Sequence, residues 1–308
     1  MKLLIVVNPV SGDIDKKQFL KEATKLCSSK LIEFSIFKTT GVDDEKNLKK
    51  AIREYNPDKV ASAGGDGTTL LTAVCLKNTG IPMGIIPLGS ANGMANDLIV
   101  NSDPLIALTD LIHSEKYLDL DLILINDKYF CIHIGDIGFN AKIIEDYSKD
   151  PRRGKITYLK YFIKAYYSKQ TFEYEILANK EVFKGKAIMI GICNGRKYGT
   201  GVPLNKNGSP FDGKLELVLV NYATAKTLLR AGLSIFSDDY IDIHNAQVIE
   251  CSEASIFLSE KKILQLDGEI IGKVDEIHAK VLKGAVRYIS QSKTHHPENI
   301  NKVIHQSA

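Results

Sequence analysis

The stretch from residue 60 to residue 70, VASAGGDGTTL, constrains the fold of this chain more than any other. A short apolar run leads into a turn built from Gly64, Gly65, Asp66 and Gly67. Apolar residues at helical spacing follow, which predicts a helix over residues 68–77. Glycine lets a ligand approach the backbone closely, and the N-terminus of a helix favours an anion. The stretch therefore predicts a phosphate site, where backbone amides and Thr68 contact phosphate oxygens and Asp66 lies near Mg²⁺ or a ligand hydroxyl.

Strand and helix patterns alternate on both sides of this turn. Apolar strand patterns cover residues 3–7, 31–37, 59–63 and 83–88, and helix patterns lie between them at 16–29, from 43 and at 68–77. This rhythm predicts an α/β fold with a doubly wound parallel sheet. A second glycine turn, residues 89–95, follows the fourth strand and leads into a helix. Both turns would converge on the carboxyl edge of the sheet, where ligands bind in this architecture.

The pattern changes near residue 118, where apolar and polar residues begin to alternate. Strand patterns then dominate, at 118–124, 129–134, 186–193, 215–220, 247–251, 254–258, 262–266 and 278–282, with one helical insert at 155–168. Alternation of this kind predicts a C-terminal, mostly antiparallel β domain. We expect an α/β domain over 1–118, a β-rich domain over 119–290, and a tail over 291–308 that could pack back on the N-terminal domain.

Charge and cysteine usage exclude several classes of protein. A net charge of +3 over 308 residues is too small to indicate nucleic-acid binding. The apolar run after Lys2 is shorter than the core of a signal peptide, and no run approaches the ~20 residues of a membrane span. Five scattered cysteines without CxxC spacing predict reduced, mostly buried thiols and no zinc site. The sequence thus predicts a cytoplasmic protein without a transmembrane segment, and it leaves the oligomeric state open.

Six short motifs occur along the chain in a fixed order. They are NPVSG at 8–12, GGDGT at 64–68, PLGSANGMA at 87–95, GDIGFNA at 135–141, FDGKLEL at 211–217 and LDGE at 266–269. As a set they resemble the diacylglycerol kinase catalytic-domain superfamily, which contains diacylglycerol, sphingosine and ceramide kinases and related bacterial lipid kinases. The resemblance spans about residues 3–285, and it implies that the domain over 1–118 binds the nucleotide and that the β-rich domain over 119–290 binds the lipid substrate. It implies a kinase that uses ATP and Mg²⁺ and phosphorylates a lipid hydroxyl, with diacylglycerol, giving phosphatidic acid, as the first candidate acceptor.

The resemblance also implies which residues bind the nucleotide. These are Asn8, Pro9, Ser11, Gly12, Thr39, Thr40, Gly64, Gly65, Asp66, Gly67, Thr68, Gly89, Ser90 and Asn92. The sequence does not choose between Thr39 and Thr40, and Ser90 or Asn92 could instead cap the following helix. Gly93 stands where most relatives that phosphorylate diacylglycerol have Asp, which weakens the choice of acceptor; Asp97 lies one helical turn further on.

The LDGE motif has two readings. An Asp-Gly pair between two alternating segments is a type I′ hairpin signal. The resemblance makes Glu269 the general base that accepts the proton of the lipid hydroxyl, with Asp267 and Asp66 as the supporting carboxylates of the catalytic set. At Asp212 the choice lies between a plain turn and, as the resemblance implies, a structural Mg²⁺ held by Asp212 and by groups near Ser209 and Lys214.

The segment 149–169 carries seven basic residues and one acid, Asp150, interleaved with tyrosines. It predicts either a solvated helix face or a surface attracted to anionic lipid headgroups. The second reading would bring the enzyme to a lipid substrate at the inner face of the membrane.

Several alternatives stay open. The acceptor could be a sphingoid base, ceramide or phosphatidylglycerol. An NAD kinase shares the GGDG turn. A member that binds lipid or nucleotide without turnover is the third alternative, and Gly93 is the feature that favours it.

Overall fold

The computed structural model describes residues 1–9, 15–150, 157, 160, 161, 164, 171–195, 208–221 and 246–291. The described chain forms two compact units, residues 1–121 with 283–291, and residues 122–282. The division falls inside strand β5 (Tyr117–Ile125) and inside strand β14 (Glu269–Ile289), so each of these strands belongs to both units.

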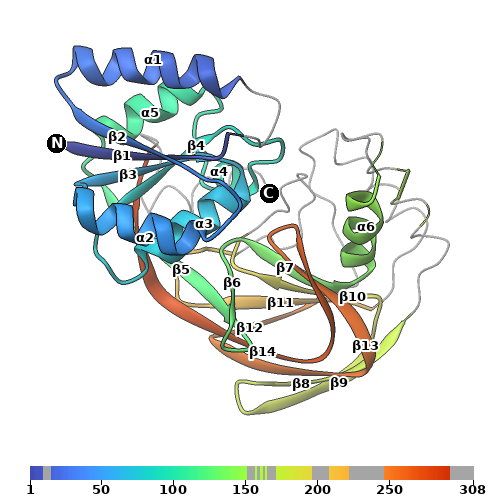
Figure 1. Cartoon of the computed structure of the whole chain (residues 1–308). Helices are drawn as coiled ribbons and strands as arrows, with labels where there is room; N and C mark the ends of the chain where they lie inside the picture. Colours follow the sequence, from blue (N-terminus) through green and yellow to red (C-terminus); the bar gives the residue numbers. More distant parts are fainter. Residues whose placement is uncertain are drawn as a thin grey trace, which may run out of the picture. The chain divides into compact units, whose positions relative to one another are not determined.

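The first unit is built on a parallel sheet in the order β4–β3–β1–β2. Its strands are β1 (Lys2–Val7), β2 (Glu33–Lys38), β3 (Lys59–Gly64) and β4 (Met83–Pro87). Its helices are α1 (Lys16–Ser29), α2 (Asp44–Tyr55), α3 (Asp66–Leu76), α4 (Gly93–Asp97) and α5 (Pro104–His113). Figure 1 shows α1 and α5 on one face of this sheet and α2 and α3 on the other. The predicted doubly wound parallel sheet is confirmed.

Local sequence explains where these helices begin. Asp15 caps α1 by accepting hydrogen bonds from the N–H groups of Lys17 and Gln18. Asp103 caps α5 in the same way, and Pro104 occupies the first helical position, where its missing N–H costs nothing. Strands β3 and β4 are buried along their whole length, as expected for a sheet covered on both faces.

The end of β14 and the residue two positions beyond it contact the parallel sheet of the first unit. Tyr288 pairs in parallel with Met83 of β4. The side chain of Gln291, which is 3% exposed, then takes the place of a neighbouring strand. Its Oε1 accepts the N–H of Ile85 at 2.6 Å, and its Nε2 donates to the carbonyl oxygens of Ile85 at 2.7 Å and of Ala107 at 3.0 Å. Residues 283–291 therefore complete a unit that begins at Met1.

Gln291→Met should lower the free energy of unfolding by about 3 kcal/mol, because it leaves buried backbone polar groups of Ile85 and Ala107 without partners. Denaturant titration followed by circular dichroism measures this change. Gln247→Met, which alters an exposed glutamine, is the control and should stay within about 0.5 kcal/mol of the wild type. Equal stability of the two variants would contradict a structural role for Gln291.

The second unit is antiparallel, with the strand order β12–β11–β10–β7–β13–β14 and the hairpin β8–β9 paired to β13 through β8. Its strands are β6 (Tyr129–Cys131), β7 (Ile134–Gly138), β8 (Phe172–Ala178), β9 (Glu181–Ala187), β10 (Met189–Cys193), β11 (Leu215–Val220), β12 (Ala246–Cys251) and β13 (Glu253–Leu266). One helix, α6 (Phe139–Ser148), follows β7. The predicted antiparallel β domain is confirmed.

Three predicted strand boundaries in this unit were wrong. The strand predicted over 129–134 is two strands, β6 and β7, because the N–H groups of Ile132 and His133 bond to a side chain instead of a neighbouring strand. The strand predicted over 186–193 breaks at Ile188. The two strands predicted over 254–258 and 262–266 form the single strand β13, with a register shift between them. Most of the helical insert predicted at 155–168 lies outside the described residues.

Candidate functional site

The two glycine turns of the first unit meet at the carboxyl edge of the sheet. The ends of β3 and β4 are neighbours, with Gly64 paired to Pro87. A Cβ atom on Gly65 would lie 3.3 Å from the Cα atom of Gly89, and one on Gly89 would overlap the backbone of Gly65. The position of Gly89 therefore requires glycine, and that of Gly65 leaves little room for a side chain, because the two backbones are in contact. The predicted convergence of the two turns is confirmed.

Asp66 joins these two turns. Its Oδ2 accepts the N–H of Gly93 at 2.9 Å and its Oδ1 accepts the N–H of Met94 at 3.0 Å. The first residue of α3 thus caps the first turn of α4, where a carboxylate is favourable. This finding replaces the expectation that Ser90 or Asn92 is the cap.

Asn92 closes its own turn. Its backbone is left-handed, with φ at +52°, and its side chain makes no bond to the helix that follows. Instead Oδ1 accepts the N–H of Gly89 at 2.8 Å, and Nδ2 donates to the carbonyl oxygen of Gly89 at 2.7 Å. The turn is therefore rigid before any ligand arrives, and Ser90 at its tip is exposed.

The other predicted nucleotide residues follow the C-terminal ends of neighbouring strands. Asn8 and Pro9 come directly after β1; Ser11 and Gly12 lie outside the described residues. Thr39 and Thr40 come directly after β2, and they differ in exposure. Thr39 is buried, whereas Thr40 is exposed and donates its N–H to Oδ1 of Asp44 at 2.8 Å.

The threonine and the last glycine of GGDGT lie on the first turn of α3. Thr68 is buried, and its side chain lies directly against Gly64. Gly67 is exposed, and a Cβ atom there would meet nothing within 4 Å. The position of Gly67 on the first turn of α3 is therefore open, which is compatible with a ligand beside this turn.

The LDGE motif of the second unit forms the tight turn between β13 and β14. Leu266 pairs with Glu269, and the two central residues have positive φ, +48° at Asp267 and +89° at Gly268. A type I′ hairpin requires positive φ at both positions. The prediction of a type I′ hairpin from the Asp-Gly pair is therefore correct. It neither supports nor opposes the predicted catalytic role of Glu269.

Asp267 anchors this turn. Its carboxylate accepts the N–H groups of three successive residues, Ile132 at 2.8 Å, His133 at 2.9 Å and Ile134 at 3.1 Å. Burial raises the pKa of the Asp267 carboxyl, and the hydrogen bonds from the backbone offset part of that rise. A carboxylate engaged in this way holds the turn in place.

Glu269 differs from Asp267 in its exposure and in its hydrogen bonding. Its side chain is exposed and makes no hydrogen bond or ion pair with the described residues. The turn thus presents one anchored carboxylate and one available carboxylate two residues apart.

The predicted metal site at Asp212 has a simpler arrangement in the described residues. Oδ1 of Asp212 accepts the N–H of Lys214 at 2.9 Å, and the ammonium of Lys214 pairs with Glu250 at 2.5 Å. Ser209 lies half-buried just upstream. The described part of the chain contains no group of three or more His, Cys, Asp or Glu residues that could hold a metal. A Mg²⁺ at Asp212 stays a prediction.

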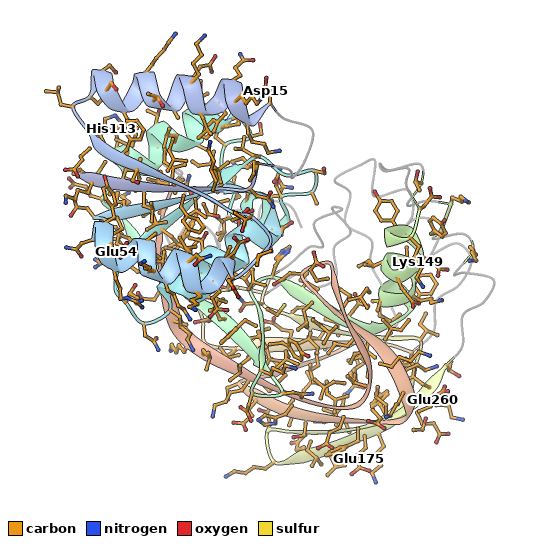
Figure 2. All side chains as sticks on the ribbon, viewed as in Figure 1. Asp15, Glu54, His113, Lys149, Glu175 and Glu260 are labelled. Carbon is orange, nitrogen blue, oxygen red and sulfur yellow. The ribbon has the colours of Figure 1, made fainter. Side chains whose placement is uncertain are left out.

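The described lysines of the basic segment are paired with acids. Lys149, which extends from the end of α6 in Figure 2, pairs with Glu145 at 3.1 Å. Lys164 pairs with Asp146 at 3.1 Å, and Lys160 lies 3.6 Å from Asp150. The basic segment, as defined from the sequence, begins at residue 149 and therefore does not include the acids of α6. These pairs favour the solvated helix face over the lipid-headgroup surface.

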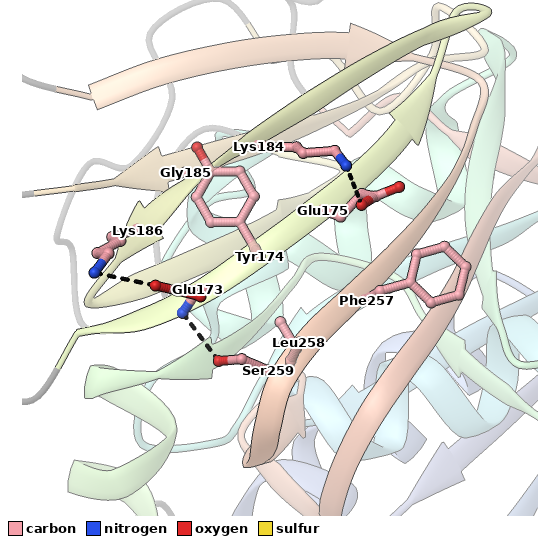
Figure 3. Close-up of a pocket in the computed structure, with 9 residues that line it drawn as sticks. All are labelled: Glu173, Tyr174, Glu175, Lys184, Gly185, Lys186, Phe257, Leu258 and Ser259. Carbon is pink, nitrogen blue, oxygen red and sulfur yellow. Dashed lines mark hydrogen bonds and ion pairs between the residues drawn. The ribbon is translucent and has the colours of Figure 1, made fainter.

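A hollow of about 530 Å³ lies on the outer face of β8, β9 and β13 (Figure 3). Two ion pairs cross the hairpin beside it, Lys184 to Glu175 at 2.7 Å and Lys186 to Glu173 at 3.0 Å. None of the predicted site residues lines this hollow, so it is separate from the motifs described above.

All five cysteines are buried and free, as predicted. Within the described ranges, no helix has the length and apolar character needed to cross a membrane.

Both units match known protein families. The model of the diacylglycerol kinase catalytic domain matches residues 2–124, and that of the YegS C-terminal NAD kinase beta sandwich-like domain matches residues 136–290. A protein from Salmonella newport named "Probable lipid kinase YegS" is 28% identical over 294 residues, 92% of this chain and 94% of its own length. A protein from Staphylococcus carnosus with a provisional lipid-kinase name is 28% identical over 234 residues, 73% of this chain and 74% of its own.

Solved structures show the same fold. A diacylglycerol kinase from Bacillus anthracis superposes with a TM-score of 0.70 at 20% identity, covering 94% of this chain and 96% of its own. A second structure from the same organism gives a TM-score of 0.73 at 21% identity, covering 94% and 95%.

Proposed function

Because the chain belongs to the diacylglycerol kinase and YegS family of lipid kinases, we propose that it transfers the γ-phosphate of ATP to a lipid hydroxyl. Diacylglycerol is the first candidate for that lipid. The observation that carries this proposal is the exposed carboxylate of Glu269 on a turn that Asp267 anchors. Each unit contributes one part of the reaction: the first binds the phosphate donor, and the second accepts the proton.

The first unit suits the phosphates of ATP. The contact between Gly65 and Gly89 brings two turns and the N-terminus of α3 to one edge, where the helix dipole favours negative charge. Asp66 contributes by holding the second turn through Gly93 and Met94. We propose Asn8, Thr40 and Ser90 as the flanking contacts, because they lie at the same strand ends.

The second unit supplies the base. A lipid hydroxyl is a poor nucleophile at neutral pH, and a carboxylate within hydrogen-bond reach can accept its proton as the oxygen attacks the γ-phosphate. Glu269 takes that proton, ADP leaves, and no covalent intermediate with the protein is needed. Asp267 acts indirectly, because its oxygens are engaged with the backbone.

Mg²⁺ would neutralise charge on the phosphates when bound. Kinases hold it with one or two carboxylates and the substrate phosphates rather than with a cage built by the protein. The described residues offer no such cage. The requirement for Mg²⁺ is therefore part of the proposal, and the roles of Asp66 and Glu269 above do not depend on where the ion binds.

Purified protein with labelled ATP and Mg²⁺ should phosphorylate a lipid when it is given diacylglycerol, sphingosine, ceramide, phosphatidylglycerol and NAD in separate reactions. We expect the largest yield of labelled product, identified by mass spectrometry, with diacylglycerol. A phosphorylated product from NAD alone would support an NAD kinase. NAD is included among the acceptors because the family model that matches residues 136–290 is described as NAD kinase beta sandwich-like. ATP binding without any labelled product would support a family member that binds lipid or nucleotide but does not catalyse phosphate transfer.

A further inference from the structure

A chain of buried hydrogen bonds runs from α6 to the turn that carries Glu269. Strands β7 and β13 place Asp136 directly opposite Gln265, and their side chains are 0% and 1% exposed. Oδ1 of Asp136 accepts the N–H of Ala141 at 2.7 Å, and Oδ2 accepts Nε2–H of Gln265 at 2.5 Å. Oε1 of Gln265 then accepts the N–H of Gly268 at 2.8 Å.

These bonds fix the orientation of the Gln265 amide. One end must donate, because it faces a carboxylate, and the other end must accept, because it faces an N–H group. A flipped amide would lose both bonds. Since a buried polar group without a partner is costly, the amide has one stable orientation.

The turn is consequently held at both of its central residues. Asp267 is fixed through its own carboxylate, and Gly268 is fixed through its N–H. Glu269 is the next residue, and its side chain has no anchor of its own among the described residues. Its placement therefore depends on the backbone that precedes it.

We propose that Gln265 and Asp136 are positioning residues for Glu269. This inference rests on the proposed function, because it assumes that Glu269 accepts a proton in the reaction. A general base must lie within hydrogen-bond reach of the reacting hydroxyl, and a displacement of 1 Å can cost about 100-fold in rate. Gln265 and Asp136 set that distance without contacting the substrate.

Gln265→Met keeps the volume of the side chain and removes both hydrogen bonds. We expect kcat for lipid phosphorylation to fall by about 100-fold while KM for ATP stays within about twofold, because the phosphate-binding turns are unchanged. Gln291→Met is the matched control. It alters a glutamine of similar burial and bonding in the first unit, and its kcat, measured where the protein is folded, should stay within about threefold of the wild type.

Gln265→Glu supplies a second, independent readout. When protonated, a glutamic acid can donate to Asp136 and accept from Gly268, as glutamine does. When ionised, it faces the Asp136 carboxylate and is repelled. The ratio of its kcat to that of the wild type should therefore fall as the pH rises from 5.5 to 9. Taking the ratio at each pH removes the titration of Asp267 and His133, which both proteins share. The titration of Asp136 is coupled to the new carboxyl in the variant alone, and this coupling is the effect that the ratio measures.

Three outcomes would overturn the inference. The first is a Gln265→Met protein with kcat within about threefold of the wild type, and the second is a ratio for Gln265→Glu that does not change with pH. The third is an equal loss of kcat in Gln265→Met and Gln291→Met, which would show that the loss of kcat reflects lower stability of the folded protein. If Glu269→Gln turns over normally, Glu269 is not the base and the inference fails with that role, while the lipid-kinase activity stands. If the wild type phosphorylates no lipid, the proposed function itself fails. If Glu269→Gln is impaired and Gln265→Met is not, only the positioning role is lost.

Discussion

Glu269→Gln should reduce kcat for lipid phosphorylation by about 10²–10⁴-fold and leave KM for ATP within about twofold. The amide cannot accept a proton from the lipid hydroxyl, but it keeps the size of the side chain and the hairpin around it. Stability should change little, because the carboxylate is exposed and has no partner among the described residues. Steady-state assays with varied lipid and varied ATP measure both constants.

Glu276→Gln is the control for this experiment. Glu276 is also exposed and lies on the same strand, seven residues beyond Glu269. The same chemical change there should leave kcat unaltered. Undiminished turnover by Glu269→Gln would remove that residue from the base role.

Asp66→Asn should weaken ATP binding by about 10–100-fold, and it should also lower the free energy of unfolding by about 1–2 kcal/mol. Asp66 uses its two oxygens separately, one for Gly93 and one for Met94. An asparagine can accept only one of these bonds, and its NH₂ group would face the other N–H. The second glycine turn would then lose its fixed position beside the first. Calorimetric titration with ATP and thermal unfolding measure the two effects.

Asp103→Asn provides a matched comparison. Asp103 caps α5 with a single oxygen, Oδ1, which accepts the N–H groups of both Leu105 and Ile106. Asparagine can do the same and is an equally good cap. We therefore expect little loss of stability and no loss of ATP binding. Equal ATP affinity in the Asp66 and Asp103 variants would show that Asp66 does not hold the phosphate site together.

The sequence predicts features that depend on neighbouring residues. The strand of residues 59–63 ends at a glycine turn, and its run of small and apolar residues is enough to indicate a buried parallel strand. The Asp267-Gly268 pair indicates a type I′ turn for the same reason, since both the pair and its strands are local. Convergence of the two glycine turns also follows, because strands of one parallel sheet end at one edge.

The roles of Asp66 and Asp267 could not be predicted in this way. The groups that bind them are backbone N–H groups 27 and about 133–135 residues away, and an N–H group leaves no signature in the sequence. The role of Gln265 has no signature in the sequence for a similar reason. A glutamine in a strand of alternating residues reads as solvent-facing until the structure places it opposite Asp136.

The bond between Gln291 and Ile85 joins residues 206 positions apart. The first unit is thus discontinuous along the chain, whereas the second is a single stretch inserted into it. During synthesis the strands of the parallel sheet are made first, yet Ile85 of β4 lacks this hydrogen-bond partner until residue 291 has been made. Contacts of such long range form slowly. The first unit therefore completes its folding only after the second unit has been synthesised, and a fragment that ends near residue 121 would leave the backbone groups of Ile85 and Ala107 without Gln291.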